Sequence, residues 1–455
     1  MDSLLDARED GERKWMYPLL RKGRYYKWRS WLSYVYLILF FTGPFLRING
    51  QPFLMLNVID RQFVLLGQVF WPQDIFLFML ASLVFVVCVV LFTIAFGRIF
   101  CGWICPQTIF MEMVFRKIEI WIEGDAGKRK KLDTAPWTKD KIGKKTLKHF
   151  LFLIVSFLIA NTFLAYIIGS EGLINIITQP VNLHWVGFFS IWVFTIVFYL
   201  VYSQVRELVC TVICPYGRLQ GVLMDENTLV VAYNEVRGEP RGKLDKTAAS
   251  LKGDCVDCGL CVAVCPTGID IRNGTQMECI NCTACIDVCD EVMDKINKPR
   301  NLVGYFSESM IRTQQKPTFN GRMKGYSVVI TALMVVLGYF IFNRTDMDIT
   351  VMRGAGMLYQ EQPGGYISNI YNADITNKSN NSRNIILKPE DKYVKIKYIQ
   401  APGIAGKGSE VKTVFFILIP AAKINALKTD VRLQLISGNK IIQTVTTTFV
   451  GPLNN

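Results

Sequence analysis

Histidine is nearly absent from this chain, which has only His149 and His184 among its 455 residues. A transmembrane haem with two histidine ligands needs a histidine pair within the membrane-spanning segments. These two histidines flank apolar segments at opposite ends, so the sequence argues against such a haem, and we interpret His149 as an interfacial residue.

The sequence also lacks the motifs of several enzyme classes. It has neither the phosphate-binding G-x-x-x-x-G-K-[ST] loop nor the dinucleotide-binding G-x-G-x-x-G motif, and no catalytic Ser–His constellation. We therefore predict no nucleotide or flavin site.

Charged residues are scarce, at 19% of the chain against 51% hydrophobic residues, and the mean hydropathy is +0.26. This balance indicates a membrane protein. The formal net charge is +14, but the basic residues flank the apolar segments instead of forming a separate patch. They are typical of the loops of a membrane protein, so we predict no nucleic-acid partner.

Five apolar segments approach the length of about 20 residues that a helix needs to cross a bilayer. The first is short and contains Gly43 and Pro44. The N-terminus has no apolar core of a cleavable signal peptide, so the first segment is predicted to stay as an anchor. The five predicted spans are residues 31–46, 75–96, 150–168, 185–202 and 327–342.

Basic residues in the loops predict the orientation of these spans. The first thirty residues hold eight Lys or Arg and residues 97–149 hold twelve, whereas residues 169–184 hold none. Because cytoplasmic loops are enriched in Lys and Arg, the N-terminus is predicted to be cytosolic. Five crossings then place the loop of residues 203–325 in the cytosol and the C-terminal tail outside.

The tail contains no cysteine and alternates short β-rich runs with turn signals. Examples are YISNIYNADITN from Tyr366 and KTVFFILIP from Lys412, with turn sequences such as QPGG and SGN between runs. This pattern predicts an all-β, immunoglobulin-like sandwich.

Eight of the thirteen cysteines fall within residues 255–289. They form two runs with the spacing C-x2-C-x2-C-x3-C, which bacterial ferredoxins use to bind [4Fe–4S] clusters. Proline follows the first run as Pro266, whereas Asp290 follows the second. Zinc is the alternative, because paired C-x2-C motifs also hold Zn²⁺, but two complete four-cysteine runs favour clusters.

In such a module, the last cysteine of each run ligates the other cluster. The first predicted cluster is ligated by Cys255, Cys258, Cys261 and Cys289. The second is ligated by Cys279, Cys282, Cys285 and Cys265.

Two further cysteine pairs follow the second and fourth spans, each as Cys-x-x-Ile-Cys-Pro. A spacing of four residues predicts that both thiols of a pair lie on one helical face, and the proline places each pair near a helix end. We predict that the four thiols converge on a copper site, a third cluster or a dithiol relay, because soft thiolates select Cu(I), zinc and iron–sulfur centres. Two independent packing pairs are the alternative. The four residues are Cys101, Cys105, Cys210 and Cys214.

Two other features have simpler interpretations. Cys88 lies in the middle of the second span and is interpreted as a small hydrophobe. After Pro106, apolar residues recur at Phe110, Val114, Ile118 and Ile122. This periodicity predicts an amphipathic helix, either at the membrane interface or packed on the ferredoxin-like module.

The chain resembles the FixG/RdxA/CcoG family over nearly its whole length. The likeness rests on GRIFCGWICPQTIFMEMVFRKIEIWIEGDAGKRKKLD, ELVCTVICPYGRLQGVL, VRGEPRGK, the two cysteine runs and IQAPGIAGKGSEVKTVFFILIP, in that order. The family consists of membrane polyferredoxins that assist assembly of cbb-type haem–copper cytochrome oxidase.

The resemblance implies a multi-pass protein of the bacterial inner membrane that reduces Cu(II) to Cu(I) for oxidase maturation. It further implies that the two CxxxCP pairs are the copper-reducing site. Copper ion and oxidase assembly factors or a copper transporter are the implied partners, and the electron donor is left unnamed. The alternatives are an electron carrier between a quinol or cytosolic donor and a periplasmic reductase, and a non-catalytic assembly scaffold.

We therefore predict a multi-domain membrane protein with five parts. These are a cytosolic basic N-terminus (1–30), a four-helix transmembrane region with both CxxxCP motifs (31–215), a cytosolic ferredoxin-like domain (216–325), a fifth transmembrane helix (326–342) and a periplasmic β-sandwich (343–455).

Overall fold

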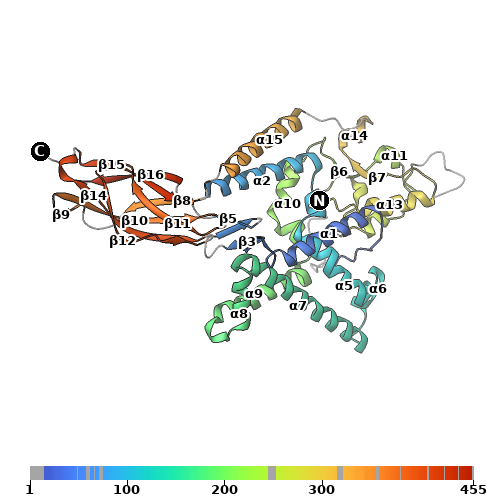
Figure 1. Ribbon diagram of the computed structural model, residues 1–455. Coiled ribbons are helices and arrows are strands. Elements are labelled where there is room, and N and C mark those ends of the chain that lie inside the picture. Colours follow the sequence, from blue (N-terminus) through green and yellow to red (C-terminus); the bar gives the residue numbers. More distant parts are fainter. Residues whose placement is uncertain are drawn as a thin grey trace. The chain divides into compact units, whose positions relative to one another are not determined.

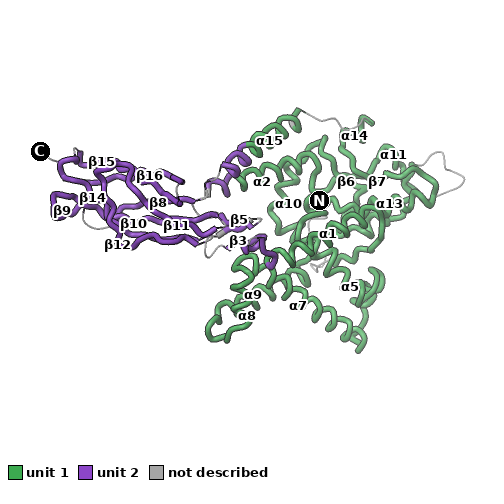
Figure 2. The backbone as a smooth tube through the Cα atoms, viewed as in Figure 1, with its two compact units in different colours: residues 1–44, 81–335 green, residues 45–80, 336–455 purple. Residues whose placement is uncertain are grey.

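The computed structural model describes residues 15–48, 50–57, 62–65, 67–70, 75–243, 253–314, 321–343, 345, 347–354, 358–379, 381–406, 409–424, 426–438 and 440–452. The first fourteen residues of the predicted basic N-terminus lie outside this set. The chain forms two compact units, which Figure 2 colours separately. Unit 1 comprises Met1–Pro44 and Ala81–Val335, and unit 2 comprises Phe45–Leu80 and Val336–Asn455.

Four helices in the described part of the chain are long and apolar enough to cross a membrane. They are α2 (Ile75–Phe96), α7 (Lys139–Ile168), α9 (Trp185–Leu200), which the π-helical turn η4 (Val201–Val205) continues, and α15 (Gly321–Phe342) (Figure 1). The last four predicted spans fall within these helices. Between α7 and α9 lie α8 (Ser170–Thr178) and the 3-10 turn η3 (Val181–Leu183).

The first predicted span differs from the structure. Helix α1 runs from Arg24 to Thr42 and ends before Gly43 and Pro44. It is not among the four helices above, because its first two turns are basic and polar and its apolar part is short. Its inner side packs against the bundle, where Ser33 is buried and Phe40 contacts Phe110 with ring centroids 5.1 Å apart.

The segment after α2 folds as a series of short helices. These are α3 (Ile99–Trp103), α4 (Pro106–Ile109), the π-helical turn η2 (Phe110–Phe115), α5 (Arg116–Glu123) and α6 (Ala126–Thr134). The predicted apolar face is present, since Phe110 is buried and Val114 and Ile118 are half-buried against the core around Phe115 and Phe152.

Several charged residues of the same segment lie inside the protein. Arg116, Glu119 and Glu123 are all buried. Arg206 donates from Nη1 and Nη2 to the two carboxylate oxygens of Glu119, at 2.7 and 2.8 Å. Charges can be buried when they are paired and hydrogen-bonded, so α5 packs inside the bundle through an ion-pair network.

After η5 (Val209–Ile213) and α10 (Pro215–Leu223), the chain enters the ferredoxin-like module. Strand β6 (Val230–Tyr233) precedes both cysteine runs and pairs antiparallel with β7 (Val303–Phe306), which follows them. Between the two strands lie α11 (Glu235–Gly238), α12 (Leu260–Ala263), the 3-10 turn η6 (Ile271–Asn273) and α13 (Ala284–Lys295), and α14 (Glu308–Thr313) follows β7. Val231, Ile271, Ile286, Met293 and Leu302 form its buried core.

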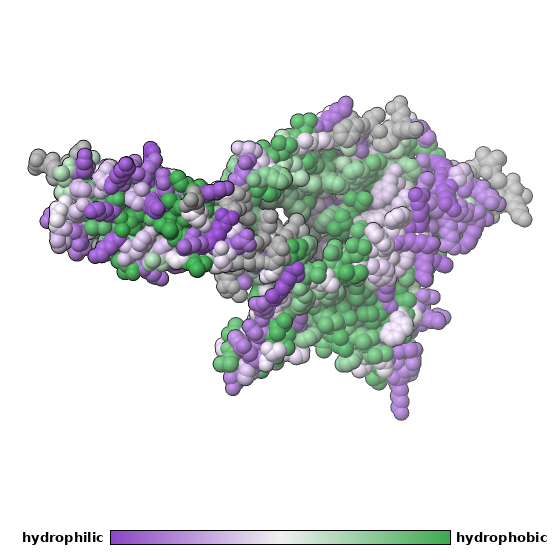
Figure 3. All heavy atoms as spheres, in the orientation of Figure 1, coloured by the Kyte–Doolittle hydropathy of each residue, from purple (hydrophilic) through white to green (hydrophobic). Residues whose placement is uncertain are grey.

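Hydropathy differs between parts of unit 1. On the face shown in Figure 3, hydrophobic side chains gather over the long helices and hydrophilic ones over the region of α13. Such an apolar exterior is expected of helices that contact lipid.

The C-terminal part of unit 2 is a sandwich of two antiparallel sheets. The first has the order β12–β14–β10–β8 with β9 also paired to β10, and the second has the order β13–β11–β15–β16. The bounds are β8 (Met347–Arg353), β9 (Gln360–Gln362), β10 (Tyr366–Asn377), β11 (Arg383–Pro389), β12 (Lys395–Gln400), β13 (Ile404–Ala405), β14 (Glu410–Pro420), β15 (Lys428–Ser437) and β16 (Lys440–Val450); the 3-10 turn η7 (Ala421–Lys423) follows β14. Tyr371, Phe415, Ile417, Leu433 and Phe449 lie in their shared core.

Unit 2 also contains five short strands that were not predicted from the sequence. They are β1 (Arg47–Ile48), β2 (Gln51–Pro52), β3 (Leu54–Asn57), β4 (Gln62–Leu65) and β5 (Gln68–Phe70). They form a two-stranded and a three-stranded sheet. None is longer than four residues, which is the lower limit of the runs from which a strand can be recognised.

Candidate metal centres

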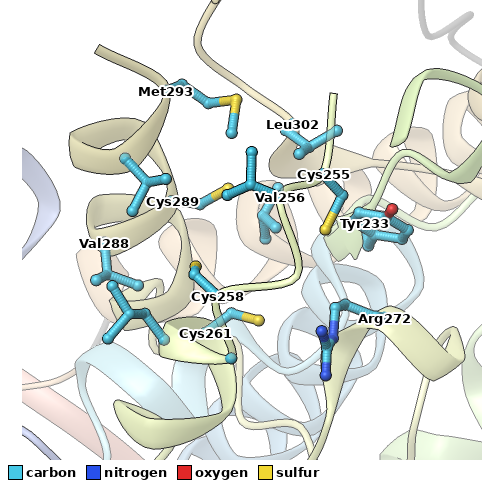
Figure 4. A pocket seen from close by; sticks show the side chains of 14 residues that line it. Tyr233, Cys255, Val256, Cys258, Cys261, Arg272, Val288, Cys289, Met293 and Leu302 are labelled. Atoms are coloured by element: carbon cyan, nitrogen blue, oxygen red, sulfur yellow. The ribbon is translucent and has the colours of Figure 1, made fainter. Parts of the chain in front are cut away.

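Four of the predicted cluster ligands surround one cavity of the ferredoxin-like module. Cys255, Cys258, Cys261 and Cys289 all line it (Figure 4). Cys289 comes from α13, whereas the other three belong to the first run. This is the set of four that the ferredoxin spacing assigns to the first cluster.

A second cavity groups the remaining four thiols. Cys279, Cys282 and Cys285 line it together with Cys265 from the first run. Cys261 also borders this cavity, so the two cavities are neighbours. The last cysteine of each run therefore lines the cavity that belongs to the other run.

The backbone of the two runs repeats an uncommon conformation. Asp257 and Gly259 flank Cys258 with φ of 51° and 65°, and Asn281 and Thr283 flank Cys282 with φ of 52° and 66°. A β-branched residue such as Thr283 rarely adopts positive φ, and strain of this kind clusters at functional sites. Turns of this kind direct successive N–H groups into a concavity that binds anions, including iron–sulfur clusters.

The chemistry of these thiols fits the same assignment. Burial raises the pKa of Cys279 and of Cys289 to about 12, although backbone N–H groups near their sulfur atoms, at Asn281 and Val303, favour the thiolate. A metal ligand must be deprotonated, so cluster binding would release protons and stabilise a site that is unfavourable for bare thiolates. The residues present therefore fit two [4Fe–4S] clusters, which would supply one-electron chemistry when bound.

Each CxxxCP pair was predicted to lie on one face of a continuous helix, but in the structure a break in the helix separates its two cysteines. Cys101 lies within α3, whereas Cys105 precedes α4, which begins at Pro106. The second pair is arranged in the same way, with Cys210 in η5 and Cys214 directly before Pro215. Each proline starts a new helix, because the residue before proline disfavours helical geometry. The prediction that each pair shares one helical face is thus wrong, and the prediction of a helix end is confirmed.

The four thiols of these pairs are nevertheless neighbours. Burial first, and then the nearby thiols of Cys105, Cys101 and Cys214, raise the pKa of Cys210 to about 12. The pKa of Cys101 rises to about 11, again through burial first, while Arg98 opposes the rise. Two hydrogen bonds support this proximity, because Arg98 donates to the carbonyl oxygen of Cys210 and Cys101 donates to Gln220, six residues after Cys214. The fold therefore brings the two CxxxCP motifs side by side, and we call their four cysteines the four-thiol site.

Two buried polar residues that were not predicted from the sequence, Gln220 and Thr93, form a hydrogen-bonded chain with the Cys101 thiol. Cys101 donates from Sγ to Oε1 of Gln220 at 3.1 Å, and Gln220 donates from Nε2 to Oγ1 of Thr93 at 3.2 Å. Gln220 and Thr93 are both buried. No sequence signal distinguished Gln220, because it lies in α10 beyond the second motif and meets Cys101 only in the folded chain.

The four-thiol site packs directly on the second cysteine run. A Cβ atom added to Gly102 would lie 2.4 Å from the carbonyl oxygen of Ile280. Trp103 donates from Nε1 to the carbonyl oxygen of Asn281 at 3.2 Å. Arg98 donates to the carbonyl oxygens of Met277 and Cys210, so one guanidinium joins the second run to the second CxxxCP motif.

All thirteen cysteines are free thiols. Among the residues that the structure describes, no group of three His, Cys, Asp or Glu side chains is arranged to hold a single ion.

The remaining predicted residues do not line the two cluster cavities. Cys88 is half-buried in α2. His149 shares a hydrogen bond of 3.0 Å with the Tyr199 hydroxyl, and His184 shares one of 2.6 Å with Gln179.

Family models match most of this architecture. One described as a 4Fe–4S dicluster domain matches residues 205–308. Another described as a 4Fe–4S binding domain matches residues 78–131 and 183–226, which include all four cysteines of the CxxxCP pairs. A third, described as an IG-like fold at the C-terminal of FixG, matches residues 337–452.

Several characterised proteins are similar to this chain. Protein RdxA of Cereibacter sphaeroides is 34% identical over 383 residues, covering 81% of this chain and 80% of its own length. Protein RdxB of the same organism is 32% identical over 459 residues, covering 94% and 95%. Nitrogen fixation protein FixG of Rhizobium meliloti is 36% identical over 304 residues, covering 65% and 57%.

One solved structure is also similar in part. It is the crystal structure of a FixG-related protein from Vibrio parahaemolyticus, with 18% identity and a TM-score of 0.21. The match covers 24% of this chain and all of that one.

Proposed function

Because this chain belongs to the FixG/RdxA family of iron–sulfur electron-transfer proteins, we propose that it reduces Cu(II) to Cu(I) at the four-thiol site. The copper would then serve assembly of a haem–copper cytochrome oxidase. The observation that carries this proposal is the contact between the Cys101–Cys105 segment and the second cysteine run, through Gly102 and Trp103.

The two cysteine runs are the electron store in this proposal. Cys255, Cys258, Cys261 and Cys289 would hold one [4Fe–4S] cluster, and Cys279, Cys282, Cys285 and Cys265 the other. The second cavity adjoins the backbone of Ile280 and Asn281, and these residues contact Gly102 and Trp103. The chain thus provides a packed path from the runs to the four-thiol site.

The thiols of Cys101, Cys105, Cys210 and Cys214 would move closer together to bind the substrate ion, because no three of them are arranged around a single ion in the described structure. Thiolate is a soft ligand that binds Cu(I) in preference to harder ions, so the site favours the product oxidation state. Gln220 accepts the hydrogen bond of Cys101 and fixes the orientation of that thiol. A third [4Fe–4S] cluster is the second candidate for this site, because a 4Fe–4S family model covers all four cysteines.

The proposed location is the bacterial inner membrane. Lys and Arg are abundant between α2 and α7, which supports a cytosolic location for that segment, and α7 and α9 return the chain to the same side for the ferredoxin-like module. A cytosolic N-terminus, which its eight Lys and Arg support, requires α1 to cross the membrane as a fifth, shorter span. The β-sandwich would then be periplasmic, and its partner an oxidase assembly factor or copper transporter.

Anaerobic copper reduction tests this function. Full-length protein is reduced with dithionite, desalted and mixed with Cu(II), and Cu(I) is measured with bicinchoninate. The double variant Cys101→Ser/Cys105→Ser should lose reduction while its low-temperature EPR spectrum from the ferredoxin-type clusters is unchanged. Cys88→Ser is the matched control and should reduce copper normally.

Two results decide the assignment. If the double variant reduces Cu(II) at the wild-type rate, the four-thiol site is not the site of copper reduction. Iron analysis separates the two candidates for that site: two clusters contain about eight irons per chain, and a third raises the content to about twelve.

A further inference from the structure

An apolar cavity of about 340 Å³ adjoins the four-thiol site. Its walls come from α1, α2, α3 and α10, all within unit 1. Its volume falls within the range of small-molecule sites. Five of its lining residues come from α2, a helix that can cross the membrane. A ligand could therefore enter from the bilayer.

The aromatic residues that line the cavity favour a ligand with a planar ring. Five aromatic side chains border the cavity: Phe85, Phe92, Phe100, Trp103 and Tyr216. Phe100 and Tyr216 meet edge to face, with ring centroids 6.2 Å apart. Aromatic walls favour stacking and edge contacts with a planar ligand, whereas a lipid acyl chain needs only an apolar surface.

Two residues that carry hydroxyl groups, Thr93 and Tyr216, belong to this otherwise apolar lining. The Thr93 hydroxyl donates to the carbonyl oxygen of Val89 at 2.8 Å. Thr93 also accepts the hydrogen bond of Gln220, which in turn accepts that of Cys101. A buried polar chain therefore runs from the cavity to the four-thiol site.

Trp103 connects the cavity with the ferredoxin-like module. Its ring forms part of the wall, and its indole N–H donates to the carbonyl oxygen of Asn281 in the second cysteine run. A ligand in the cavity would thus contact both redox regions of unit 1 through residues of α3. This placement suits a membrane-soluble redox carrier.

We propose that this cavity binds the head group of an isoprenoid quinone or quinol. The quinoid ring lies between the aromatic side chains. A ring hydroxyl of the quinol donates to Thr93, whose own hydrogen is donated to the Val89 carbonyl oxygen, and the Tyr216 hydroxyl donates to or accepts from a ring oxygen. The isoprenoid tail extends along α2 into the bilayer. The proposal rests on the electron-transfer function above and identifies the class of electron donor.

Photolabelling of the full-length protein tests this site. Protein in lipid nanodiscs is illuminated with an azido-ubiquinone, and labelled peptides are mapped by mass spectrometry. Labelling should be saturable, should be displaced by ubiquinone-1, and should map to residues 85–104 or 216. Val89→Trp fills the cavity and should lower labelling at least about tenfold.

The matched control lies one turn earlier on the same helix. Val86 is 56% exposed and does not line the cavity, so Val86→Trp should be labelled like wild type. Thr93→Val removes the hydroxyl with little change in volume and should weaken displacement by ubiquinone-1 about fivefold to tenfold, the effect of one hydrogen bond.

Two outcomes would overturn the proposal. One is equal labelling of Val89→Trp and Val86→Trp. The other is labelling that ubiquinone-1 does not displace but added phospholipid does, which would identify an acyl-chain site. Copper reduction by dithionite-reduced wild type needs no quinol, so its failure would count against the proposed function and leave the labelling result intact.

Discussion

Asp287 of α13 accepts hydrogen bonds from the backbone N–H groups of Tyr25 and Tyr26, at 3.0 and 2.8 Å. Asp287 lies between Cys285 and Cys289, whereas the two tyrosines are in the first turn of α1 (Figure 1). The first N–H groups of a helix have no partner within it, and a carboxylate there also interacts favourably with the helix dipole. One side chain therefore joins the cluster-binding helix to the N-terminal helix.

Replacing Asp287 by Ala should loosen this junction. The loss of a capping carboxylate costs about 1 kcal/mol and leaves two amides without their acceptor. Hydrogen–deuterium exchange of the peptide that contains Tyr25 and Tyr26 should become faster, with unchanged iron content. Glu291→Ala, which removes an exposed pair with Lys295 on the same helix, should leave the exchange unchanged. Equal exchange in wild type and Asp287→Ala would contradict this role.

Gly102→Ala should disturb the contact between the four-thiol site and the second cysteine run. The new Cβ would lie 2.4 Å from a backbone oxygen, so the two segments must separate. We expect destabilisation of about 1–3 kcal/mol and slower copper reduction, by up to about a hundredfold for a displacement of about 1 Å. Stopped-flow measurement of Cu(I) formation checks the rate.

Gly127→Ala is the control for this change. Gly127 lies in α6, and an added Cβ would have open space around it. This variant should reduce copper at the wild-type rate. If both alanine variants do so, close packing at Gly102 is not needed for electron delivery.

Glu119 should make stability depend on pH in the acid range. Burial alone would raise its pKa, but the charges of Arg206, Arg116 and Lys148 together lower it to about 2, from an ordinary value of 4.5. A carboxyl with a depressed folded pKa stabilises the protein above the unfolded pKa. That stabilisation, about 3 kcal/mol, is lost as the pH falls from about 4.5 to about 2.

Glu119→Gln tests this directly. Breaking a buried pair from one side costs about 3–5 kcal/mol at neutral pH. Arg129 and Arg206 lose the carboxylate that they share, and Arg206 keeps only its pair of 3.6 Å with Glu207. Thermal unfolding of wild type and Glu119→Gln in detergent is followed by circular dichroism from pH 7 to pH 2. The difference between their unfolding temperatures should become smaller below pH 4.5. A difference in unfolding temperature that does not change with pH would contradict the lowered pKa of Glu119. Asp140→Asn, which removes an exposed pair with Lys144, should behave like wild type.

Asn369 should stabilise the β-sandwich by joining its two sheets. Its amide donates to the carbonyl oxygen of Val450 at 2.9 Å and accepts from the Val450 N–H at 2.8 Å, and the residue is buried. Asn369→Ala leaves both Val450 groups unpaired, at a cost of about 2–3 kcal/mol. Limited proteolysis should then release the end of β16 faster. Asn372→Ala, an exposed position on the same strand, should not change the rate of release.

The sequence by itself determined the features that depend on neighbouring residues. Four long apolar helices follow from hydropathy, because a span of about 20 apolar residues is local information. The division of the eight ferredoxin cysteines into two sets of four follows from their spacing, and the structure places the same sets around two cavities. Several C-terminal strands were predicted from the sequence, but β11 was not. Three consecutive apolar residues, Ile385, Ile386 and Leu387, interrupt the alternation of apolar and polar residues that indicates a strand.

Only the tertiary structure decided how distant segments meet. It brought Cys101 and Cys105 beside Cys210 and Cys214, broke each pair at its proline, and placed Gln220 against Cys101. It also buried Arg206 and Glu119, whose charges in a single sequence indicate an exposed face. A charge or amide is stable inside a protein only when a partner satisfies it, and that partner lies about ninety to one hundred and twenty residues away in these cases.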